Sequence, residues 1–322
     1  MTALTHDIDQ TVPMSHPRAG LALALGSAVS FGLSGALARP LLESGWSAGT
    51  VSMFRIAIAG LAVLPFGLSA LRGRWSLLRA NAGTLLLYGL VAVTVAQFCY
   101  FSAVRHMEVA PALLIEFTAP ATVVAWMWLR HGQRPGRVTF LGAAIAVLGL
   151  VLVLDLLSGA DLSTAGVLWA LAAMVGCTTH FVVSGDTTNG LPPLTLAAGG
   201  FVVATVALAT LGLTGLLPMA TASEQVTYAG TSVSPWVVLV TLGLVTAALP
   251  YTLGIAAARH LGSRLASFVA LSEVVAGVLW AIVLLGEVPR PVQVLGGVLI
   301  LTGVVAVKLG ERSIRTVDPL PV

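Results

Sequence analysis

Long apolar stretches with very few charges are the feature that most constrains what this chain can fold into. Of its 322 residues, 57% are hydrophobic and only 9% are charged, whereas soluble domains carry roughly 25% charged residues. So few charges cannot cover a surface that faces water, and a disordered chain requires low hydrophobicity. The sequence therefore excludes a soluble globular protein and predicts one that is solvated by lipid.

The length of the apolar stretches predicts how often the chain crosses the membrane. A spanning helix needs about 20 mostly apolar residues, because the hydrocarbon core is about 30 Å thick. Charged and turn-forming residues divide the chain into ten such stretches, at about residues 19–38, 48–68, 82–104, 109–129, 138–156, 164–184, 193–217, 235–258, 264–285 and 291–309. We therefore expect an all-α integral membrane protein with ten transmembrane helices.

The positions of the basic residues predict the orientation. With ten spans both termini lie on one side, which then carries 12 Arg and Lys residues against 3 on the other side. Positive residues stay in the cytoplasm, so we expect a multi-pass protein of the cell (inner) membrane with both termini cytoplasmic. The run from Leu21 is interpreted as the first span, because the acidic segment before it does not resemble the start of a signal peptide.

The two halves of the chain match each other in sequence. A shift of 154 residues aligns most of the second half with the first, and a shift of 146 aligns the first span with the sixth. Pairs that match at 154 are Arg105 with Arg259, His106 with His260, Trp126 with Trp280, Gly132 with Gly286, Pro135 with Pro289 and Gly149 with Gly303. A match of this length indicates an internal duplication.

Each copy would hold five spans, so the second copy must cross the membrane in the opposite direction. The expected organisation is a cytoplasmic tail at 1–18, a five-helix repeat at 19–157, an inverted repeat at 163–309 and a cytoplasmic tail at 310–322. Inverted repeats are typical of secondary transporters, which alternate between two conformations around a site near the midplane.

Several segments resemble the drug/metabolite transporter superfamily, EamA family, over roughly residues 19–309. They are Phe54-Arg55-Ile56, Leu284-Leu285-Gly286-Glu287 and Gly296 through Gly303, while Ile115 to Pro120 is similar to the threonine/homoserine exporter branch. The first repeat departs from the pattern, because Gln133 stands at the position that matches Glu287. The resemblance implies ten helices and the export of small metabolites, often amino acids.

Two carboxylates fall inside predicted spans. Glu273 is nine residues into the span 264–285, and Glu116 is about six residues into the span 109–129. A charge at the bilayer centre costs about 2.5–3.5 kcal/mol on insertion scales, and such residues usually face an interior cavity. We therefore predict that Glu116 and Glu273 bind substrate and carry protons. The alternative is a protonated carboxyl that bonds a neighbouring helix.

Other polar and aromatic residues of the spans are predicted to line the same cavity. They are Ser30, Ser34, Gln97, Tyr100, Trp126, His180, Tyr251 and Trp280. For each of them packing is the alternative: serines bond their own helix, tryptophans favour the membrane interface, and a histidine can be a buried packing residue. Arg55 would bind a substrate carboxylate, form a structural ion pair or extend to the interface.

The sequence narrows the function to transport without hydrolysis. It contains no Gly-x-x-x-x-Gly-Lys loop for a nucleotide and no metal-binding motif, so we expect no cofactor, no metal, no nucleotide or nucleic-acid partner and no enzyme activity. The prediction is a secondary active transporter that exports small metabolites, amino acids or related zwitterions, by proton-coupled alternating access. Its partners would be the substrate and the lipid bilayer, and the protein would be a monomer or a weak homodimer.

Three alternatives remain open at this point. A multidrug or toxic-compound exporter would have an aromatic, acidic cavity, and Arg55 discriminates, because an arginine in the cavity favours a zwitterion over a lipophilic cation. An intramembrane serine protease would use Ser34 in Gly32-Leu33-Ser34-Gly35 with His180 as base, but it leaves the second half unexplained. A channel would need a ring of like polar residues, which the sequence does not indicate.

Overall fold

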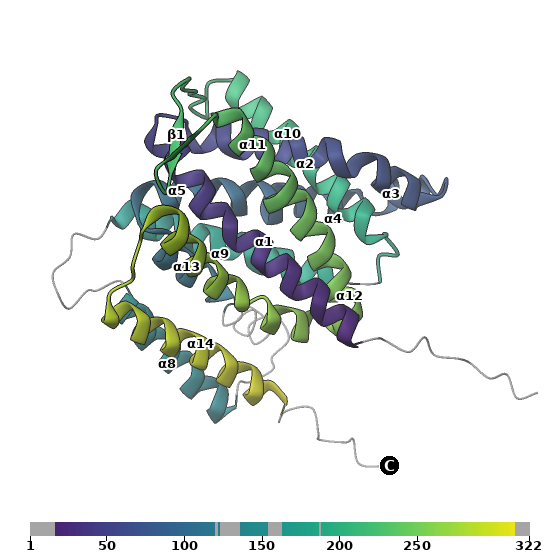
Figure 1. The fold of residues 1–322 in the computed structure, drawn as a ribbon. Helices are drawn as coiled ribbons and strands as arrows, with labels where there is room; N and C mark the ends of the chain where they lie inside the picture. Colours follow the sequence, from purple (N-terminus) through teal and green to yellow (C-terminus); the bar gives the residue numbers. More distant parts are fainter. Residues whose placement is uncertain (1–16, 120–121, 123–135, 154–162, 187, 313–322) are drawn as a thin grey trace, which may run out of the picture.

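The structure, a computed structural model, describes residues 17–119, 122, 136–153, 163–186 and 188–312, and Figure 1 shows that this part is a bundle of helices. The first half contains α1 (Pro17–Glu43), α2 (Ala48–Leu71), α3 (Ser76–Ala80), α4 (Ala82–Leu87), η1 (Tyr88–Val95), α5 (Ala96–His106), α6 (Val109–Glu116) and α8 (Arg137–Val153). The second contains α9 (Thr164–Gly185), α10 (Pro193–Leu213), β1 (Val226–Tyr228), β2 (Thr231–Val233), α11 (Pro235–Gly243), η2 (Leu244–Ala248), α12 (Leu249–Val269), α13 (Ser272–Leu285) and α14 (Pro291–Arg312).

Among the described residues, six continuous helical stretches are long and apolar enough to cross a membrane: Arg18–Glu43, Ala48–Leu71, Ala82–His106, Thr164–Gly185, Pro193–Leu213 and Pro235–Leu261. Ala82–His106 joins α4, η1 and α5, and Pro235–Leu261 joins α11, η2 and most of α12. Three shorter apolar helices are Phe140–Gly149, Ser272–Leu285 and Pro291–Gly303. Much of the predicted span 109–129 lies outside the described residues. The predicted all-helical membrane architecture is thus seen in its main features, and the count of ten spans stays a prediction.

Caps and turns set where several elements begin and end. Ser47 and Ser163 accept hydrogen bonds from the backbone N–H of Thr50 and Gly166, so each serine caps the start of a helix. A helix also ends at Gly286, whose left-handed φ of 70° turns the chain out of α13.

One predicted helix boundary and one predicted loop are wrong. The predicted span 264–285 is interrupted, because α12 continues to Val269 and α13 begins only at Ser272, which puts Glu273 in a first turn rather than nine residues deep. α6 ends at Glu116. The connection before α11, expected as a loop, contains a β-hairpin whose turn residues Ala229 and Gly230 both have positive φ, the requirement of a type I′ turn.

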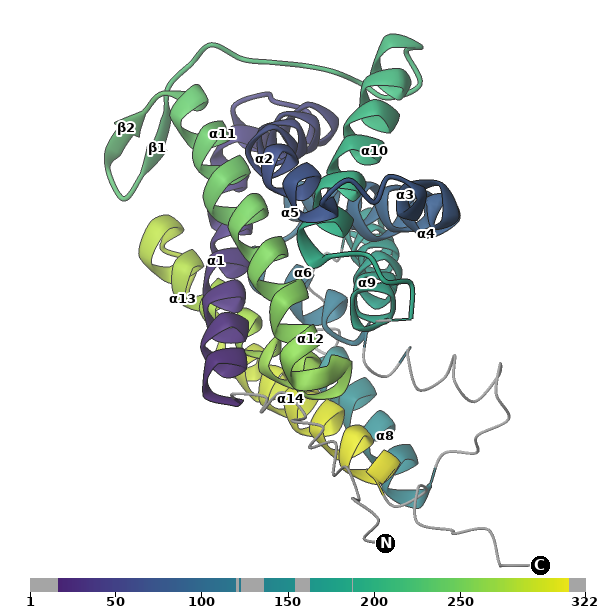
Figure 2. The same cartoon turned by 90° about the vertical axis from the view of Figure 1, so that its right-hand side faces the viewer.

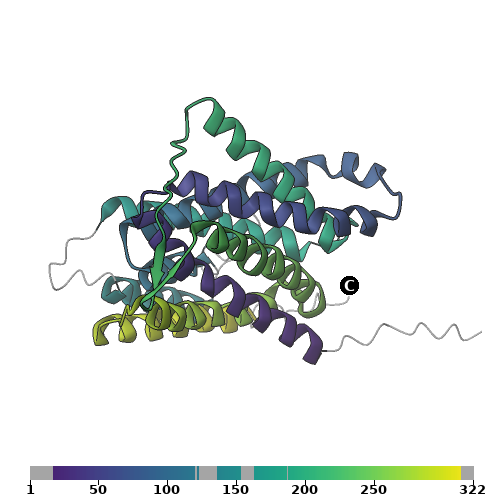
Figure 3. The ribbon, with the colours of Figure 1, turned by 45° about the horizontal axis from the view of Figure 1, so that its top comes forward.

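Helices far apart in sequence pack together. α1 lies between α12 and α13, α9 lies against α5 and α6, α2 runs along α10, and α8 runs along α14. Figure 2 shows the start of α1 and the end of α14 at the same end of the bundle, which we call the terminal end. Figures 1 and 3 show the β-hairpin at the opposite end, which we call the hairpin end.

Glycines hold α8 and α14 close together. A Cβ atom on Gly149 would lie 2.6 Å from the carbonyl oxygen of Gly296, and one on Gly303 would lie 2.5 Å from that of Gly142. The two contacts are reciprocal, because the same pair of matching positions meets on both helices. Small residues permit this approach between membrane helices, so these glycines form the seam that joins the two halves.

Candidate functional site

A cavity lies among α1, η1, α5, α9 and α12 and is bordered by the facing ends of α6 and α13. About 70 Å³ of it is open to the centres of water molecules, whereas one water needs roughly 10–15 Å³. Seven of the predicted site residues line it: Ser34, Gln97, Tyr100, Glu116, His180, Tyr251 and Glu273. In this narrow form the cavity holds a few waters rather than a large solute.

Three of the predicted site residues that the structure describes, Ser30, Arg55 and Trp280, do not line this cavity. Ser30 is absent from the lining, and the indole N–H of Trp280 donates to the carbonyl of Val29 at 3.2 Å. Trp126 lies outside the described residues. Arg55 lies behind the lining and reaches the cavity only through other side chains.

Sequence reasoning missed several lining residues. Ser27 and Phe31 face the cavity from α1, seven and three residues before the predicted Ser34, and Cys177 lies one turn before His180 on α9. Helical periodicity could have found them, because residues three or four apart share a helix face.

Among the described residues of the lining, Glu116 and Glu273 alone carry a carboxylate. They come from two helices that pack against each other, since Glu116 ends α6 and Glu273 begins α13. Each interacts electrostatically with the other and with Arg55. Neither has a hydrogen-bond partner among the described residues, so both remain available to a proton or a ligand.

Arg55 is fully buried on α2, with 0% of its surface exposed, and therefore does not extend to the membrane interface. Its guanidinium donates to Oε1 of Gln97 and to the carbonyl of Thr246, and it stands 5.1 Å from the centre of the Phe101 ring. Gln97 in turn donates from Nε2 to the Tyr251 hydroxyl at 3.0 Å. A buried chain of hydrogen bonds thus links α2 to the cavity wall.

The chemistry of this chain fixes its direction. A guanidinium only donates, so the amide oxygen of Gln97 must face Arg55 and the amide nitrogen must face Tyr251. The Tyr251 oxygen then accepts, and its own hydrogen is free to be donated, for example to the carbonyl of Ala92 at 3.4 Å. The direction of the chain thus makes the Tyr251 hydroxyl a donor, and its acceptor in this structure is a backbone carbonyl of η1.

His180 is part of the same wall. Its Nδ1 lies 3.0 Å from the Tyr88 hydroxyl, and its ring meets the ring of Tyr251 edge to face at 5.2 Å between centres. The ring both packs and lines the cavity. Because its Nδ1 bonds Tyr88, His180 is held by a tyrosine rather than by Ser34.

Each half has a π-helical segment just before its central polar residue. η1 precedes Gln97 and η2 precedes Tyr251, and the shift of 154 residues places Ala92 of η1 on Thr246 of η2. The carbonyls of these two residues accept the side-chain bonds from Tyr251 and Arg55. π-helical turns occur frequently at functional sites, and here they supply matching acceptors next to the cavity.

Comparisons with known proteins agree with this architecture. The model of the EamA-like transporter family matches twice, over residues 18–155 and 164–309. The chain is 26% identical over 305 residues to the uncharacterized inner membrane transporter YicL of Salmonella typhimurium (strain LT2), covering 93% of this chain and 98% of the relative. A solved crystal structure shares the fold, with a TM-score of 0.59 and 23% identity over 93% of this chain and 98% of its own.

A family match across most of the chain settles the class of protein. The chain belongs to the EamA-like transporter family. It is a multi-pass membrane transporter, whose partners include the bilayer and a small-molecule substrate. Membership of a transporter family also favours transport over the intramembrane protease considered from the sequence.

Proposed function

We propose that this protein is a secondary carrier for small protonated amines, which it exports in exchange for protons bound by Glu116 and Glu273. The observation that carries the proposal is the charge of the cavity: its described lining contains two carboxylates and no lysine or arginine. The sequence favoured zwitterions on the condition that Arg55 reach the cavity. Since Arg55 is buried behind Gln97, a substrate without a carboxylate fits better.

The energetics of a buried charge support a cation. A protonated amine in a low-dielectric cavity needs an opposite charge, because an unpaired buried ion is very costly. The carboxylates of Glu116 and Glu273 would supply that charge. The rings of Phe31, Tyr100 and Phe117 also border the cavity, and the faces of aromatic rings attract cations.

The same two acids would couple transport to protons. When the amine leaves, its countercharge stays behind in the membrane interior, where an ionised carboxylate without a partner is unfavourable. A proton that binds the vacated carboxylate restores neutrality and allows the carrier to return. One cation would then leave for each proton that enters, so the charge balance of the cavity is kept.

A zwitterion is the second candidate, and one observation favours it. Gln97 orients Tyr251 as a donor, whose long 3.4 Å bond to the carbonyl of Ala92 a substrate carboxylate could replace, and Ser34 is a further donor at the cavity wall. An amino acid could then place its amine at the acids and its carboxylate at these neutral donors. This candidate retains the amino-acid export predicted from the sequence.

Counterflow in liposomes tests the proposal. Purified protein would be assayed with a labelled primary amine, a labelled amino acid and a cationic dye, at roughly pH 6 and pH 8. We expect the amine to be exchanged fastest, and Glu273→Gln to lower its rate at least about tenfold and to remove its response to pH. Glu224→Gln, which removes an exposed carboxylate in a loop, is the matched control and should keep the full rate.

The outcomes separate the candidates. Faster exchange of the amino acid would replace the amine by the zwitterion, and faster exchange of the dye would indicate the multidrug alternative. If Glu273→Gln keeps both its rate and its pH response, the role of that carboxylate in coupling is wrong.

A further inference from the structure

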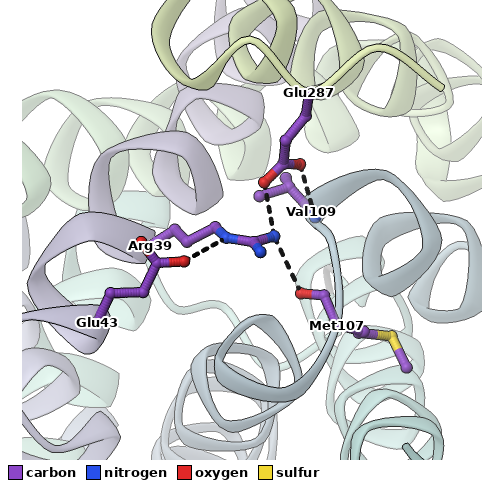
Figure 4. A network of polar contacts seen from close by, with 5 residues as sticks. All are labelled: Arg39, Glu43, Met107, Val109 and Glu287. Carbon is purple, nitrogen blue, oxygen red and sulfur yellow. Dashed lines mark hydrogen bonds and ion pairs between the residues drawn. The ribbon is translucent and has the colours of Figure 1, made fainter. Parts of the chain in front are cut away.

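A network of polar contacts joins three parts of the chain at the hairpin end, as Figure 4 shows. Nη1 of Arg39, in the last turns of α1, lies 2.6 Å from Oε1 of Glu287, in the connection between α13 and α14. The other oxygen of Glu287 accepts from the backbone N–H of Val109 at 3.3 Å. Arg39 also donates to the carbonyl of Met107 at 3.4 Å and, within α1, to Glu43 at 2.9 Å.

This network lies directly beyond the cavity. Ser34 lines the cavity, and the next residue, Gly35, packs so tightly that a Cβ atom there would collide with the Tyr100 hydroxyl and lie 2.7 Å from Cγ1 of Val109. Arg39 follows Gly35 by one helical turn. From the cavity outward, the chain thus places a tight contact of α1 with α5 and α6 and then the ion pair Arg39–Glu287.

The β-hairpin covers the same end. The Tyr228 hydroxyl of β1 donates to the carbonyl of Leu37 on α1 at 2.5 Å, and the N–H of Ala229 donates to the carbonyl of Leu284 on α13 at 3.3 Å. The hairpin therefore connects the two helices whose ends carry Arg39 and Glu287. Closure at this end involves side chains from both halves of the protein.

The cavity extends toward the other end. Its lining includes Ala24 near the start of α1, Ser184 near the end of α9 and Ala258 on α12, and the start of α1 contacts α12 through Gly20 and His260. By the shifts that align the halves, Gly185 matches Arg39 and Gln133 matches Glu287. The positions that would form the counterpart of the ion pair therefore have no charge.

We propose that Arg39 and Glu287 form a gate that holds the cavity closed at the hairpin end, and that separation of this pair exposes the cavity there. The side chains are 24% and 15% exposed, so the pair is partly buried but still reached by water. Both charges can be hydrated once the ends separate, so opening is not prevented by a large desolvation cost. Such a pair is strong enough to bias a carrier and weak enough to break in every cycle.

Cys177 provides a reporter that needs no knowledge of the substrate. It lines the cavity on α9, while the second cysteine, Cys99, would be removed as Cys99→Ala. A small, permanently charged methanethiosulfonate would be added to vesicles from one side at a time. In this background we expect Cys177 to react from the side of the terminal end and to be protected from the side of the hairpin end.

Charge reversal then tests the gate. Arg39→Glu or Glu287→Arg should raise labelling of Cys177 from the hairpin side at least about tenfold, a shift of about 1.4 kcal/mol in the closed state. The double variant R39E/E287R should return labelling to within about threefold of the background, because the pair is rebuilt with its charges exchanged. Glu224→Arg, which reverses an exposed charge in the loop before the hairpin, should change nothing.

The result does not depend on the proposed substrate. If neither single reversal raises labelling from the hairpin side, or if the double variant labels as fast as the singles, the gate is wrong even where amine counterflow succeeds. Arg39→Gln, which perturbs the fold less, should give the same direction with a smaller change. Folding of each variant is checked by the unchanged labelling of Cys177 from the terminal side.

Discussion

Residues 18–155 and 164–309 match the same family model, yet they place different side chains at matching positions. What the halves share is their packing, because α8 and α14 meet through reciprocal glycines and η1 and η2 occupy corresponding places. What they do not share is charge and polarity. By the shifts that align the halves, Arg39 corresponds to Gly185, Gln97 to Tyr251 and Glu116 to Ala270.

This difference indicates that the two halves share a backbone arrangement, whereas the polar side chains of the cavity differ between them. Matching backbones permit two related conformations, which a carrier requires. Unmatched side chains make a single site to which both halves contribute, since Glu116 comes from the first and Glu273 from the second. The two ends of the molecule are unequal for the same reason.

The largest effect is expected at the shared seam. Leucine at Gly149 or Gly303 would collide with the backbone of the facing helix, and overpacking costs about 1–3 kcal/mol or more. We expect Gly149→Leu and Gly303→Leu to lose similar amounts of stability, measured by thermal unfolding in detergent. Gly83→Leu is the control, because a Cβ there meets nothing within 4 Å. A clear difference between the stability losses of the two variants would show that the two glycine contacts are not equivalent.

The next effect concerns Arg55, which has no charged counterpart in the second half. Arg55→Met leaves the buried oxygens of Gln97 and Thr246 without a donor, at about 1–3 kcal/mol for an unsatisfied group. We expect lower thermal stability and weaker substrate binding, because the orientation of Tyr251 is released. The thermal stability of Arg55→Lys, which can keep one donor, should lie between that of the parent protein and that of Arg55→Met. If Arg55→Met is as stable as the parent, the hydrogen-bond chain does not hold this wall.

The hairpin, which the described part of the first half lacks, should give a smaller effect. Tyr228→Phe removes one hydrogen bond to α1, worth about 0.5–1.5 kcal/mol, without changing the shape of the ring. We expect a small loss of stability and a modest rise in labelling of Cys177 from the hairpin side. Tyr88→Phe, which removes a hydroxyl at the cavity wall, should leave that labelling unchanged. Equal labelling of both variants would mean that the hairpin plays no part in closure.

The family and much of the cavity lining could be predicted from the sequence. Other features could not be predicted, for physical reasons. Composition and periodicity report which residues avoid water, so the apolar helices and the carboxylates within them could be recognised. The break between α12 and α13 falls at Ala270-Leu271, which has neither glycine nor proline, so no local signal marks it. The π-helical segments likewise have no signature in the residues that form them.

Contacts between distant residues were beyond the sequence as well. Arg39 and Glu287 belong to different halves, and only the packing of α1 against α13 brings them together. The depth of Arg55 depends on where α2 meets η2 and α5, so a snorkelling arginine and a buried one have the same sequence. The hairpin turn Ala229-Gly230 is weaker than the Asn-Gly or Asp-Gly pairs that announce such turns.

The smallest expected effect is a response of the hairpin end to pH, because the pair Arg39–Glu287 at that end includes a carboxyl that can be protonated. Burial raises the pKa of Glu287 above its usual value in the closed form, although Arg39 and the N–H of Val109 oppose the shift. The other groups that face it are Glu43, Glu108 and Tyr100. In the open form the carboxyl is hydrated, so its pKa should return toward the ordinary value of about 4.3.

The sign follows from linkage, because protons favour the form that binds them more tightly. The closed form has the higher pKa, so its advantage is complete below the ordinary pKa and is lost as pH rises through the raised one. Labelling of Cys177 from the hairpin side, divided by that of Glu287→Gln at each pH, should therefore fall on acidification, by less than about tenfold. If this labelling ratio rises on acidification instead, pairing with Arg39 lowers the pKa of Glu287 by more than burial raises it, and acid opens the gate.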